Sequence, residues 1–274
     1  MTVFLVILFI LLILVSVLYV LSIRPCNSRR DRMEEFKSFY VAHRGLFNNK
    51  DIPENSMPAF ANAVYHGYAI ELDVQITKDD QLVVFHDKTL KRMCNDKRSV
   101  SKLTYAELDS LFLLNTGEKI PFFKDVLSLV SGKVPLVVEI KPEGRFIKTA
   151  ELTDKLLSEY NGSYCIESFQ PMVLKWFKEH SPETLRGQLS TVYTKKSLKK
   201  PWWMRFLLNN LMLNFISSPD FIAYNHKYKN RFTYRVCRAI YKPFNVAWTI
   251  RSQKELVNAR DVFDLFIFDS FIPR

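Results

Sequence analysis

The sequence has few cysteines, and their spacing excludes several kinds of site. The four cysteines are too far apart to form a CxxC metal or redox motif; they are Cys26, Cys94, Cys165 and Cys237. Unpaired thiols of this kind are typical of proteins from a reducing compartment. The sequence also lacks a zinc-finger, RNP or basic-zipper pattern, a repeat of fixed period and any low-complexity tract. We therefore expect no nucleic-acid partner.

Acidic residues are fewer than basic ones. There are 28 Asp and Glu against 39 Lys and Arg, which gives a net charge of +11. This excess favours an anionic partner, such as lipid headgroups or a phosphate-bearing substrate. Hydrophobic residues make up 48% and charged residues 24%, which excludes a disordered chain. A length of 274 residues accommodates one membrane segment and a single domain of about 250 residues.

Residues 2–23 contain no charged side chain. A helix of this length is about 33 Å long, which is enough to cross a bilayer core. The alternative, a cleavable signal peptide, would have a basic start and a small-x-small cleavage site. No basic side chain precedes the segment, and its exit, Ser22-Ile23-Arg24-Pro25, is a poor cleavage site. We therefore expect residues 1–23 to form a retained transmembrane anchor.

Basic side chains follow this segment and none precedes it. Arg24, Arg29, Arg30 and Arg32 come directly after it. Because Lys and Arg favour the cytoplasmic side, the asymmetry predicts a single-pass protein of the cell membrane with its main domain in the cytoplasm. Residues 24–37 are basic and polar, and we interpret them as a juxtamembrane linker. Residues 38–274 then form the domain.

Short apolar runs separated by helical stretches predict parallel βαβ units and an α/β fold. The runs 68–75 and 82–86 are joined too closely for a parallel crossover, so we expect them to form a hairpin. The remaining eight strands match a (β/α)8 TIM barrel. The charged stretch at about 88–120 is interpreted as a small insertion near the mouth of the barrel. The nine predicted strands are 39–42, 68–75, 82–86, 135–141, 164–169, 185–189, 221–226, 245–250 and 265–269.

Charged residues occupy alternate positions in two of these strands. Glu71 and Asp73 are two residues apart, so both side chains point to one face, and Glu139 and Lys141 repeat this spacing. Carboxylates that face a barrel interior repel each other unless a cation neutralises them. Oxygen ligands suit Ca²⁺ or Mg²⁺ better than zinc. The alternative, a solvated carboxylate pair on an edge strand, is disfavoured by the apolar neighbours and the third carboxylate.

Two histidines, His43 and His86, bracket the pair Glu71 and Asp73 and lie at or near the ends of apolar runs. Polar residues at the ends of successive strands build the active site of an α/β barrel. Histidine is neutral or charged near pH 7, so two histidines can supply a base and an acid. A structural role is the alternative for a single histidine. For two beside an acidic triad, we expect an enzyme.

The motifs AHRG, PENS, ELDV, FHD, EIK, SF and WT occur in this order between Tyr40 and Asp269. Together they resemble the glycerophosphodiester phosphodiesterase family, and the anchor suggests a membrane-anchored member of bacterial type. The resemblance implies a (β/α)8 barrel that hydrolyses glycerophosphodiesters to sn-glycerol 3-phosphate and an alcohol with a divalent cation, usually calcium or magnesium. The chain departs from the family where Arg251 replaces an asparagine after the WT motif, and where Phe268 replaces a threonine before Asp269.

The resemblance also implies a role for each motif residue. His43 and His86 would be the catalytic acid and base, and Glu71, Asp73 and Glu139 would hold the metal. The substrate-binding residues would be Arg44 and Lys141, at the phosphate, with Ser168, Phe169 and Trp248 lining the pocket. For both basic residues, a salt bridge to a carboxylate is the alternative to a phosphate contact.

A second apolar segment, residues 195–217, combines four lysines, two tryptophans and a narrow polar stripe. This pattern is typical of an amphipathic helix that lies in the bilayer surface. Because the segment follows a strand, we expect it beside the active site, where it would admit lipid-derived or lysolipid substrates. The alternative is an ordinary buried helix of the barrel.

Two other functions fit part of the pattern. One is hydrolysis of a membrane lipid by a lysophospholipase D or another phospholipase, since related barrels of phosphatidylinositol-specific phospholipase C also use two histidines. The E-x-D and E-x-K motifs favour the metal-dependent family over that barrel. The other is a catalytically silent membrane-binding module, which would not need a divalent cation at the carboxylates.

Overall fold

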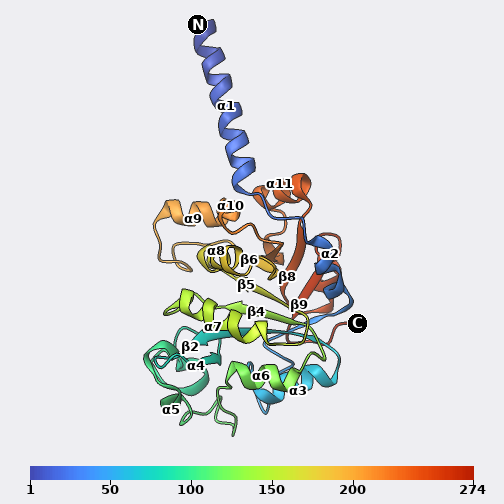
Figure 1. Cartoon of the computed structure of the whole chain (residues 1–274). Coiled ribbons are helices and arrows are strands. Elements are labelled where there is room, and N and C mark those ends of the chain that lie inside the picture. Colours follow the sequence, from blue (N-terminus) through green and yellow to red (C-terminus); the bar gives the residue numbers. More distant parts are fainter.

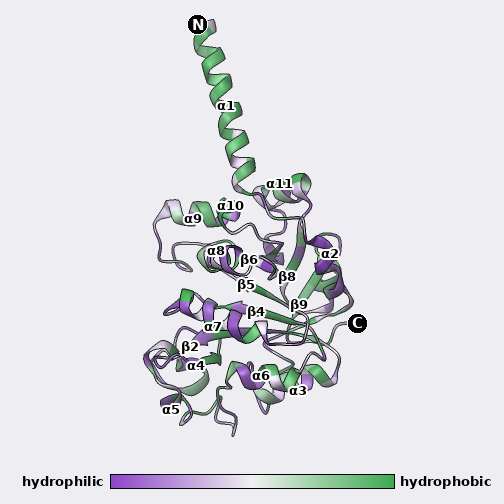
Figure 2. Cartoon of the chain, in the orientation of Figure 1, coloured by the Kyte–Doolittle hydropathy of each residue, from purple (hydrophilic) through white to green (hydrophobic).

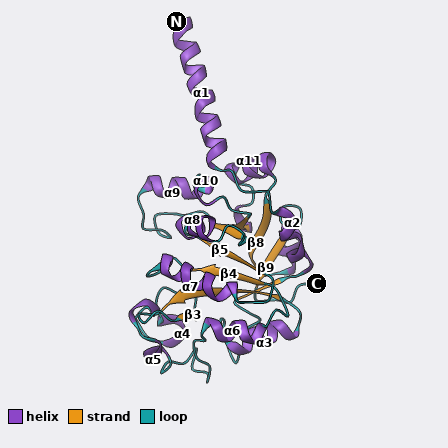
Figure 3. Cartoon of the chain, viewed as in Figure 1, coloured by secondary structure: helices purple, strands orange, loops and turns teal.

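The computed structural model describes residues 1–274, and its centre is a closed parallel barrel. Strand β1 (Val41–His43) pairs in parallel with both β2 (Ala69–Ile76) and β9 (Leu265–Phe268), so the sheet closes on itself. Helices lie outside the strands (Figure 3). The predicted (β/α)8 barrel is confirmed. The other parallel strands are β4 (Leu136–Ile140), β5 (Tyr164–Ser168), β6 (Arg186–Ser190), β7 (Phe221–Asn225) and β8 (Phe244–Ile250).

The ninth strand, β3 (Leu82–Val84), pairs antiparallel with the end of β2 and lies outside the barrel count. The turn between these strands is too short for a parallel crossover, so the hairpin follows from chain length. The expected hairpin is therefore present.

The outer helices bury one apolar face each. Helix α6 shows the spacing, because Phe123, Val126, Leu127 and Val130 recur every three or four residues and are all buried. Helix α3 begins where the Ser56 hydroxyl accepts a hydrogen bond from the amide of Ala59. The outer helices are α3 (Met57–Tyr65), α6 (Phe123–Val130), α7 (Phe146–Ser158), α8 (Pro171–His180), α11 (Phe232–Tyr241) and α12 (Gln253–Ala259).

Residues between β3 and α6 form a small unit with its own apolar core. It contains α4 (Lys91–Cys94) and α5 (Tyr105–Leu108), and α5 begins with a capping box between Thr104 and Glu107. Nine buried side chains, among them Leu90 and Leu108, form its core. This is the stretch that the sequence assigns to an insertion.

Residues 24–37, expected to be a linker, are ordered against the domain. They contain α2 (Arg30–Met33) and the start of a 3₁₀ helix (Glu34–Ser38). Met33 and Phe36 are fully buried and pack with Val41 and Phe221 from the barrel strands. Met33 and Phe36 are surrounded in the sequence by basic and acidic residues. The average composition of residues 24–37 is therefore that of a solvated linker, although these two side chains are buried.

Helix α1 (Thr2–Ser22) projects away from the barrel (Figure 1) and is apolar along almost its whole length (Figure 2). None of its residues is buried, and its length and composition make it a candidate membrane span or signal sequence. Beside its base lie α11 and the short helix α10 (Asn214–Ser217). Helix α9 (Trp202–Asn209) precedes α10 in the same layer.

The segment 195–217 is therefore not one continuous helix. A turn at Leu211, whose φ of 56° lies in the left-handed region, separates α9 from α10. Asn214 is buried there and donates a hydrogen bond from Nδ2 to the carbonyl of Ile23, 3.1 Å away. The break lets α10 pack under the end of α1 while α9 stays at the surface.

Candidate active site

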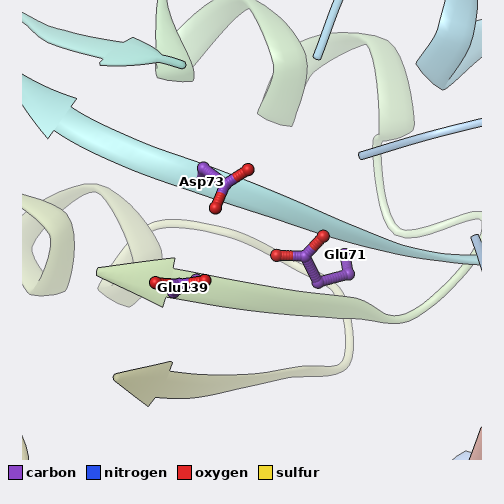
Figure 4. Close-up of side chains that lie close together, drawn as sticks. All are labelled: Glu71, Asp73 and Glu139. Atoms are coloured by element: carbon purple, nitrogen blue, oxygen red, sulfur yellow. The ribbon is translucent and has the colours of Figure 1, made fainter. Parts of the chain in front are cut away.

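Three carboxylates converge at the carboxyl ends of two neighbouring strands. Glu71 and Asp73 lie on β2, and Glu139 lies opposite Asp73 on β4. Figure 4 shows the three carboxyl groups facing a common point. One oxygen from each lies within 4.8 Å of the others, and all three residues are at most 6% exposed. The two-residue spacing on β2 thus places the pair as the sequence predicted.

Burial and mutual repulsion change the pKa values of these three carboxyl groups. Burial raises the pKa of Glu71 well above its ordinary value, and the negative charges of Asp73 and Glu139 raise it further. Burial also raises the pKa of Glu139. Burial also acts to raise the pKa of Asp73. The positive charge of Lys141 and the effects of other neighbours outweigh burial, so the pKa of Asp73 lies below its usual range. Burial therefore disfavours the charged forms of Glu71 and Glu139, while neighbouring positive charge favours the carboxylate form of Asp73.

The two basic residues of the site pair with carboxylates. Lys141 Nζ lies 2.8 Å from Glu139 Oε1 and 3.4 Å from Asp73 Oδ1. Arg44 Nη1 donates to Glu54 Oε1 over 2.6 Å, and its backbone amide donates to Glu71 Oε2 over 3.0 Å. The salt-bridge alternative is thus realised for both residues, and phosphate contact by them stays a prediction.

His43 is held by a residue from the last strand of the barrel. Its Nδ1 lies 2.9 Å from Asp269 Oδ2, and its Nε2 lies 3.9 Å from Glu71 Oε2. Burial and the positive charge of Arg44 outweigh the opposing effect of the bond to Asp269, and together they lower the pKa of His43 to about 4. With Nδ1–H donating to the carboxylate, neutral His43 carries its lone pair on Nε2.

His86 has a comparable support. Its Nδ1 donates to Asp87 Oδ1 over 2.8 Å, and Asp87 in turn accepts from Arg92 Nε over 2.7 Å. Arg92 comes from α4 in the inserted unit, and it also donates two hydrogen bonds to Glu54. Arg92 of the inserted unit thus holds the carboxylate that orients His86. Through Glu54, it is also linked to Arg44.

Both histidines line one cavity of about 160 Å³. Phe169 and Trp248 form an apolar wall, with ring centroids 5.4 Å apart in an edge-to-face arrangement. Ser168 does not line this cavity. It is fully buried and donates its hydroxyl to the carbonyl of Ile140, so its role is to join β5 to β4. Lys141 pairs with Glu139 and Asp73, and it does not line the cavity either.

Several residues of the site were not identified in the sequence. Glu167 lines the cavity from β5 and stands two residues before Phe169, so their shared face was the available signal. Asn55, within the PENS motif, donates to Asp73 Oδ2 over 2.8 Å. Asp87 directly follows His86 in the FHD motif, which was the available signal. The contacts of Arg92 with Glu54 and of Asp269 with His43 join distant parts of the chain, so they leave no local signal.

Comparison with known proteins gives a consistent result. The sequence profile of the glycerophosphoryl diester phosphodiesterase family matches residues 43–264. A glycerophosphodiester phosphodiesterase of Caldanaerobacter subterraneus is 33% identical over 180 residues, which is 61% of this chain and 71% of that protein. YhdW of Bacillus subtilis, a candidate glycerophosphodiester phosphodiesterase, is 31% identical over 79% of this chain and 87% of its own length.

The fold is also that of solved members of this family. A phosphodiesterase of Oleispira antarctica, solved in complex with the product sn-glycerol-3-phosphate, superposes with a TM-score of 0.66. The superposition covers 85% of this chain and 92% of that one at 22% identity. Profile, sequence relatives and barrel agree, so the chain belongs to the glycerophosphoryl diester phosphodiesterase family and is a phosphoric diester hydrolase.

Proposed function

We propose that this enzyme hydrolyses glycerophosphodiesters to sn-glycerol 3-phosphate and an alcohol, with His43 and His86 as the acid–base pair. The observation that carries the proposal is that both histidines line one cavity, and each has Nδ1 fixed by a carboxylate. This arrangement leaves Nε2 of each ring as the nitrogen that can exchange a proton with substrate. Family membership supports the reaction class.

The chemical sequence needs one base and one acid. One histidine takes the proton from a hydroxyl of the glycerol as that oxygen bonds to phosphorus. The other histidine gives a proton to the alcohol oxygen as its bond to phosphorus breaks, which leaves a cyclic phosphate. Water then opens the ring with the two roles reversed, which restores both histidines.

Glu71, Asp73 and Glu139 fit a hard divalent cation, Ca²⁺ or Mg²⁺. The fit rests on the donor set, which is three buried carboxylate oxygens within 4.8 Å, and on the raised pKa of Glu71. When bound, such a cation would neutralise negative charge on the phosphate oxygens. Arg44 reaches the cavity wall and is the side chain that we expect beside the phosphate, while Lys141 holds the carboxylates in place.

The assay is release of glycerol 3-phosphate from glycerophosphocholine and glycerophosphoethanolamine in the presence of calcium, magnesium or EDTA. Wild-type protein is expected to release it only with a cation, and His43→Gln and Glu71→Gln are expected to lose most of the rate. His66→Gln, which changes an exposed histidine outside the cavity, is the matched control. Full activity of His43→Gln would contradict the catalytic pair. No release from any diester would favour a silent binding module.

We also propose that α1 is a retained single-pass anchor and that the barrel lies in the cytoplasm. The absence of buried residues in α1 and the run of arginines after it support this placement. Carbonate extraction should leave the protein in the membrane. Protease added to right-side-out vesicles or cells should spare the barrel, and cleavage of the barrel in sealed cells would reverse the orientation.

A second candidate function is hydrolysis of a lysolipid by a lysophospholipase D reaction at the same site. It is favoured by α9, whose aromatic side chains face outward. Trp202 is 73% exposed and Phe206 53%, while Asn209 hydrogen bonds inward to the backbone of Tyr193. An apolar face that points away from the protein fits an interfacial helix that contacts membrane lipid.

The variant Trp202→Ser/Phe206→Ser tests this second function. We expect activity on lysophosphatidylcholine vesicles to fall far more than activity on soluble glycerophosphocholine. Val257→Ser, at an exposed apolar position on α12, is the control that removes apolar surface elsewhere. Equal losses on both substrates would assign α9 to folding and would remove the argument for lysolipid.

A further inference from the structure

A groove of about 680 Å³ lies on the surface between α11 and the turn after α12, away from the active-site cavity. Its lining is rich in positive charge, with five basic side chains against two acidic ones. None of these residues takes part in the proposed reaction. The charged lining residues are Arg30, Arg235, Arg238, Lys242, Arg260, Asp261 and Asp264.

Three of the cations form one row along α11 and its end. Arg235 and Arg238 lie three residues apart on the helix, and Lys242 directly follows its last residue, with a φ of 47°. All three line the groove. Tyr234 and Cys237 on the same helix are fully buried, and the Arg238 guanidinium lies over the Tyr234 ring, 5.5 Å from its centroid. The side-chain nitrogens of the three cations form no ion pair with a carboxylate within 4 Å, although the chain contains 28 acidic residues. The row is therefore a source of uncompensated positive charge.

The acidic side chains of the groove do not cancel this charge. Asp264 is already shared between Arg30, at 3.5 Å, and Lys37, at 3.4 Å, and it accepts a hydrogen bond from the amide of Asn245 over 2.8 Å. Asp261 is exposed at the outer edge of the groove. The unpaired row on α11 thus dominates the potential that a ligand meets.

Helix α11, which lines one side of the groove, lies next to the point where α1 leaves the domain (Figure 1). Tyr241, at the end of α11, donates its hydroxyl to the carbonyl of Val20 over 2.8 Å, and its own carbonyl accepts from Asn27. Arg30 reaches the carbonyl of Lys242 over 2.9 Å. These bonds fix the cationic row close to the end of the apolar helix, at the level where lipid headgroups would lie.

Large apolar side chains flank the row. Phe232 is 75% exposed at the start of α11, and Ile240 is 50% exposed near its end. The side-chain Oδ1 of Asn210, the residue after α9, accepts a hydrogen bond from the Thr233 hydroxyl over 2.7 Å. That bond joins α11 to the end of α9, a helix on which Trp202 and Phe206 are also exposed.

We propose that this groove binds the headgroup phosphate of an anionic phospholipid in the bilayer that α1 enters. Guanidinium groups form strong, charge-assisted hydrogen bonds with phosphate oxygens. Basic side chains beside a membrane segment attract anionic lipids, and the exposed Phe232 can contact the acyl region while the cations hold the headgroup. The proposal rests on the placement of α1 in the membrane, and it does not depend on which diester the active site hydrolyses.

The test uses the full chain in neutral detergent micelles and measures bound lipid by native mass spectrometry. We expect phosphatidylglycerol to bind more tightly than phosphatidylcholine. In Arg235→Gln/Arg238→Gln/Lys242→Gln, the affinity for phosphatidylglycerol should fall at least about tenfold, because each basic residue near an anionic surface contributes roughly fivefold. The matched control, Lys97→Gln/Lys133→Gln/Lys155→Gln, removes the same charge from three exposed lysines outside the groove and outside residues 195–217, and it should keep the affinity.

Three outcomes would overturn the proposal. They are equal binding of the two lipids by wild type, unchanged affinity in the groove variant, and an equal loss in the control variant. If millimolar inorganic phosphate displaced bound lipid and the wild type showed no preference for phosphatidylglycerol, the groove would be assigned to free phosphate instead. The exposed single change Arg235→Gln serves if the triple variant fails to fold. Hydrolysis of glycerophosphocholine and carbonate extraction are scored separately, so failure of the reaction or of the anchor is recognised independently.

Discussion

His43 Nδ1 lies 2.9 Å from Asp269 Oδ2, although 226 residues separate the two in sequence. The same carboxylate is held from its other side by Arg251, whose Nε lies 2.9 Å from Oδ1. A carboxylate in this position fixes the ring orientation of the histidine and selects the tautomer with its lone pair on Nε2. Asp269 is thus a positioning residue for the proposed acid–base pair.

The first prediction concerns this pair. Asp269→Asn is expected to lower kcat on glycerophosphocholine by at least about tenfold with little change in KM, because the amide can hold the wrong tautomer of His43. Steady-state kinetics with both parameters resolved is the measurement. Arg251→Gln leaves the bond between Asp269 and His43 in place and should cost less. A kcat for Asp269→Asn equal to that of wild type would contradict the positioning role of Asp269.

The second prediction concerns the support of His86 by the insertion. Arg92→Gln removes the bonds from α4 to both Asp87 and Glu54, and we expect kcat to fall about tenfold. Arg98→Gln is the control, since Arg98 lies in the same inserted unit but pairs with Asp96, away from the histidine. If both variants lost equal activity, the effect would belong to folding of the insertion and not to His86.

The third prediction concerns the cation. Adding calcium or magnesium at a hundredfold excess over Kd should stabilise wild type by about 2.7 kcal/mol, which corresponds to roughly 5–10 °C in Tm. Glu71→Gln/Glu139→Gln should lose this shift. The exposed carboxylates Glu151 and Glu179, changed together to glutamine, should leave it intact. Thermal unfolding with each cation and with EDTA decides between these outcomes.

The fourth prediction concerns stability against pH. Burial acts to raise the pKa of Glu54, but Arg92 and Arg44 lower it to about 2 from an ordinary 4.5. A lowered pKa in the folded state means that the stabilisation is complete above about pH 5 and is lost as the pH falls towards 2. Urea unfolding should show Glu54→Gln less stable than wild type by roughly 2–3 kcal/mol at pH 6. That gap should close on acidification, and a gap that does not change with pH would contradict the assignment.

The fifth prediction concerns the turn after His43. Gly45 has a φ of 79°, and a Cβ added there would lie 2.8 Å from the backbone of Ala59. Gly67 has a similar φ of 70° with nothing within 4 Å of the added atom. Both alanine variants share the backbone strain, so Gly45→Ala should be less stable than Gly67→Ala by about 1–3 kcal/mol of overpacking. Chemical denaturation measures both, and equal stabilities would show that α3 shifts freely.

Sequence alone predicted the parts of the site that depend on local periodicity. Alternate residues of a strand share a face in any context, so the two-residue spacing is enough to place Glu71 and Asp73 together. The hairpin of β2 and β3 followed from loop length, which is also a local property. The barrel and the cluster of carboxylates that could hold a metal were therefore accessible from the sequence.

The residues that escaped prediction depend on contacts between distant segments. Arg92 reaches Glu54 across 38 positions and Asp269 reaches His43 across 226. Glu54 and His43 lie in recognisable motifs, but no local pattern marks which distant residue each one contacts. For residues 195–217 the periodicity identified a polar stripe, but it could not say which face meets the protein. Asn214 turns inward because the carbonyl of Ile23 accepts its hydrogen bond, so the segment bends where a single helix was expected.

Closure of the barrel by β9 has a consequence for synthesis of the protein. A ribosome makes β1 early, yet its second neighbour in the sheet is the last strand to emerge. Until then, β1 and β8 each present an unpaired edge, which is a template for aggregation. Asp269 directly follows β9, so the nascent chain acquires a closed sheet and an oriented His43 in the same event. A chain that stopped before β9 would keep an aggregation-prone strand edge and would lack the residue that orients His43. We therefore expect such a product to be both aggregation-prone and inactive.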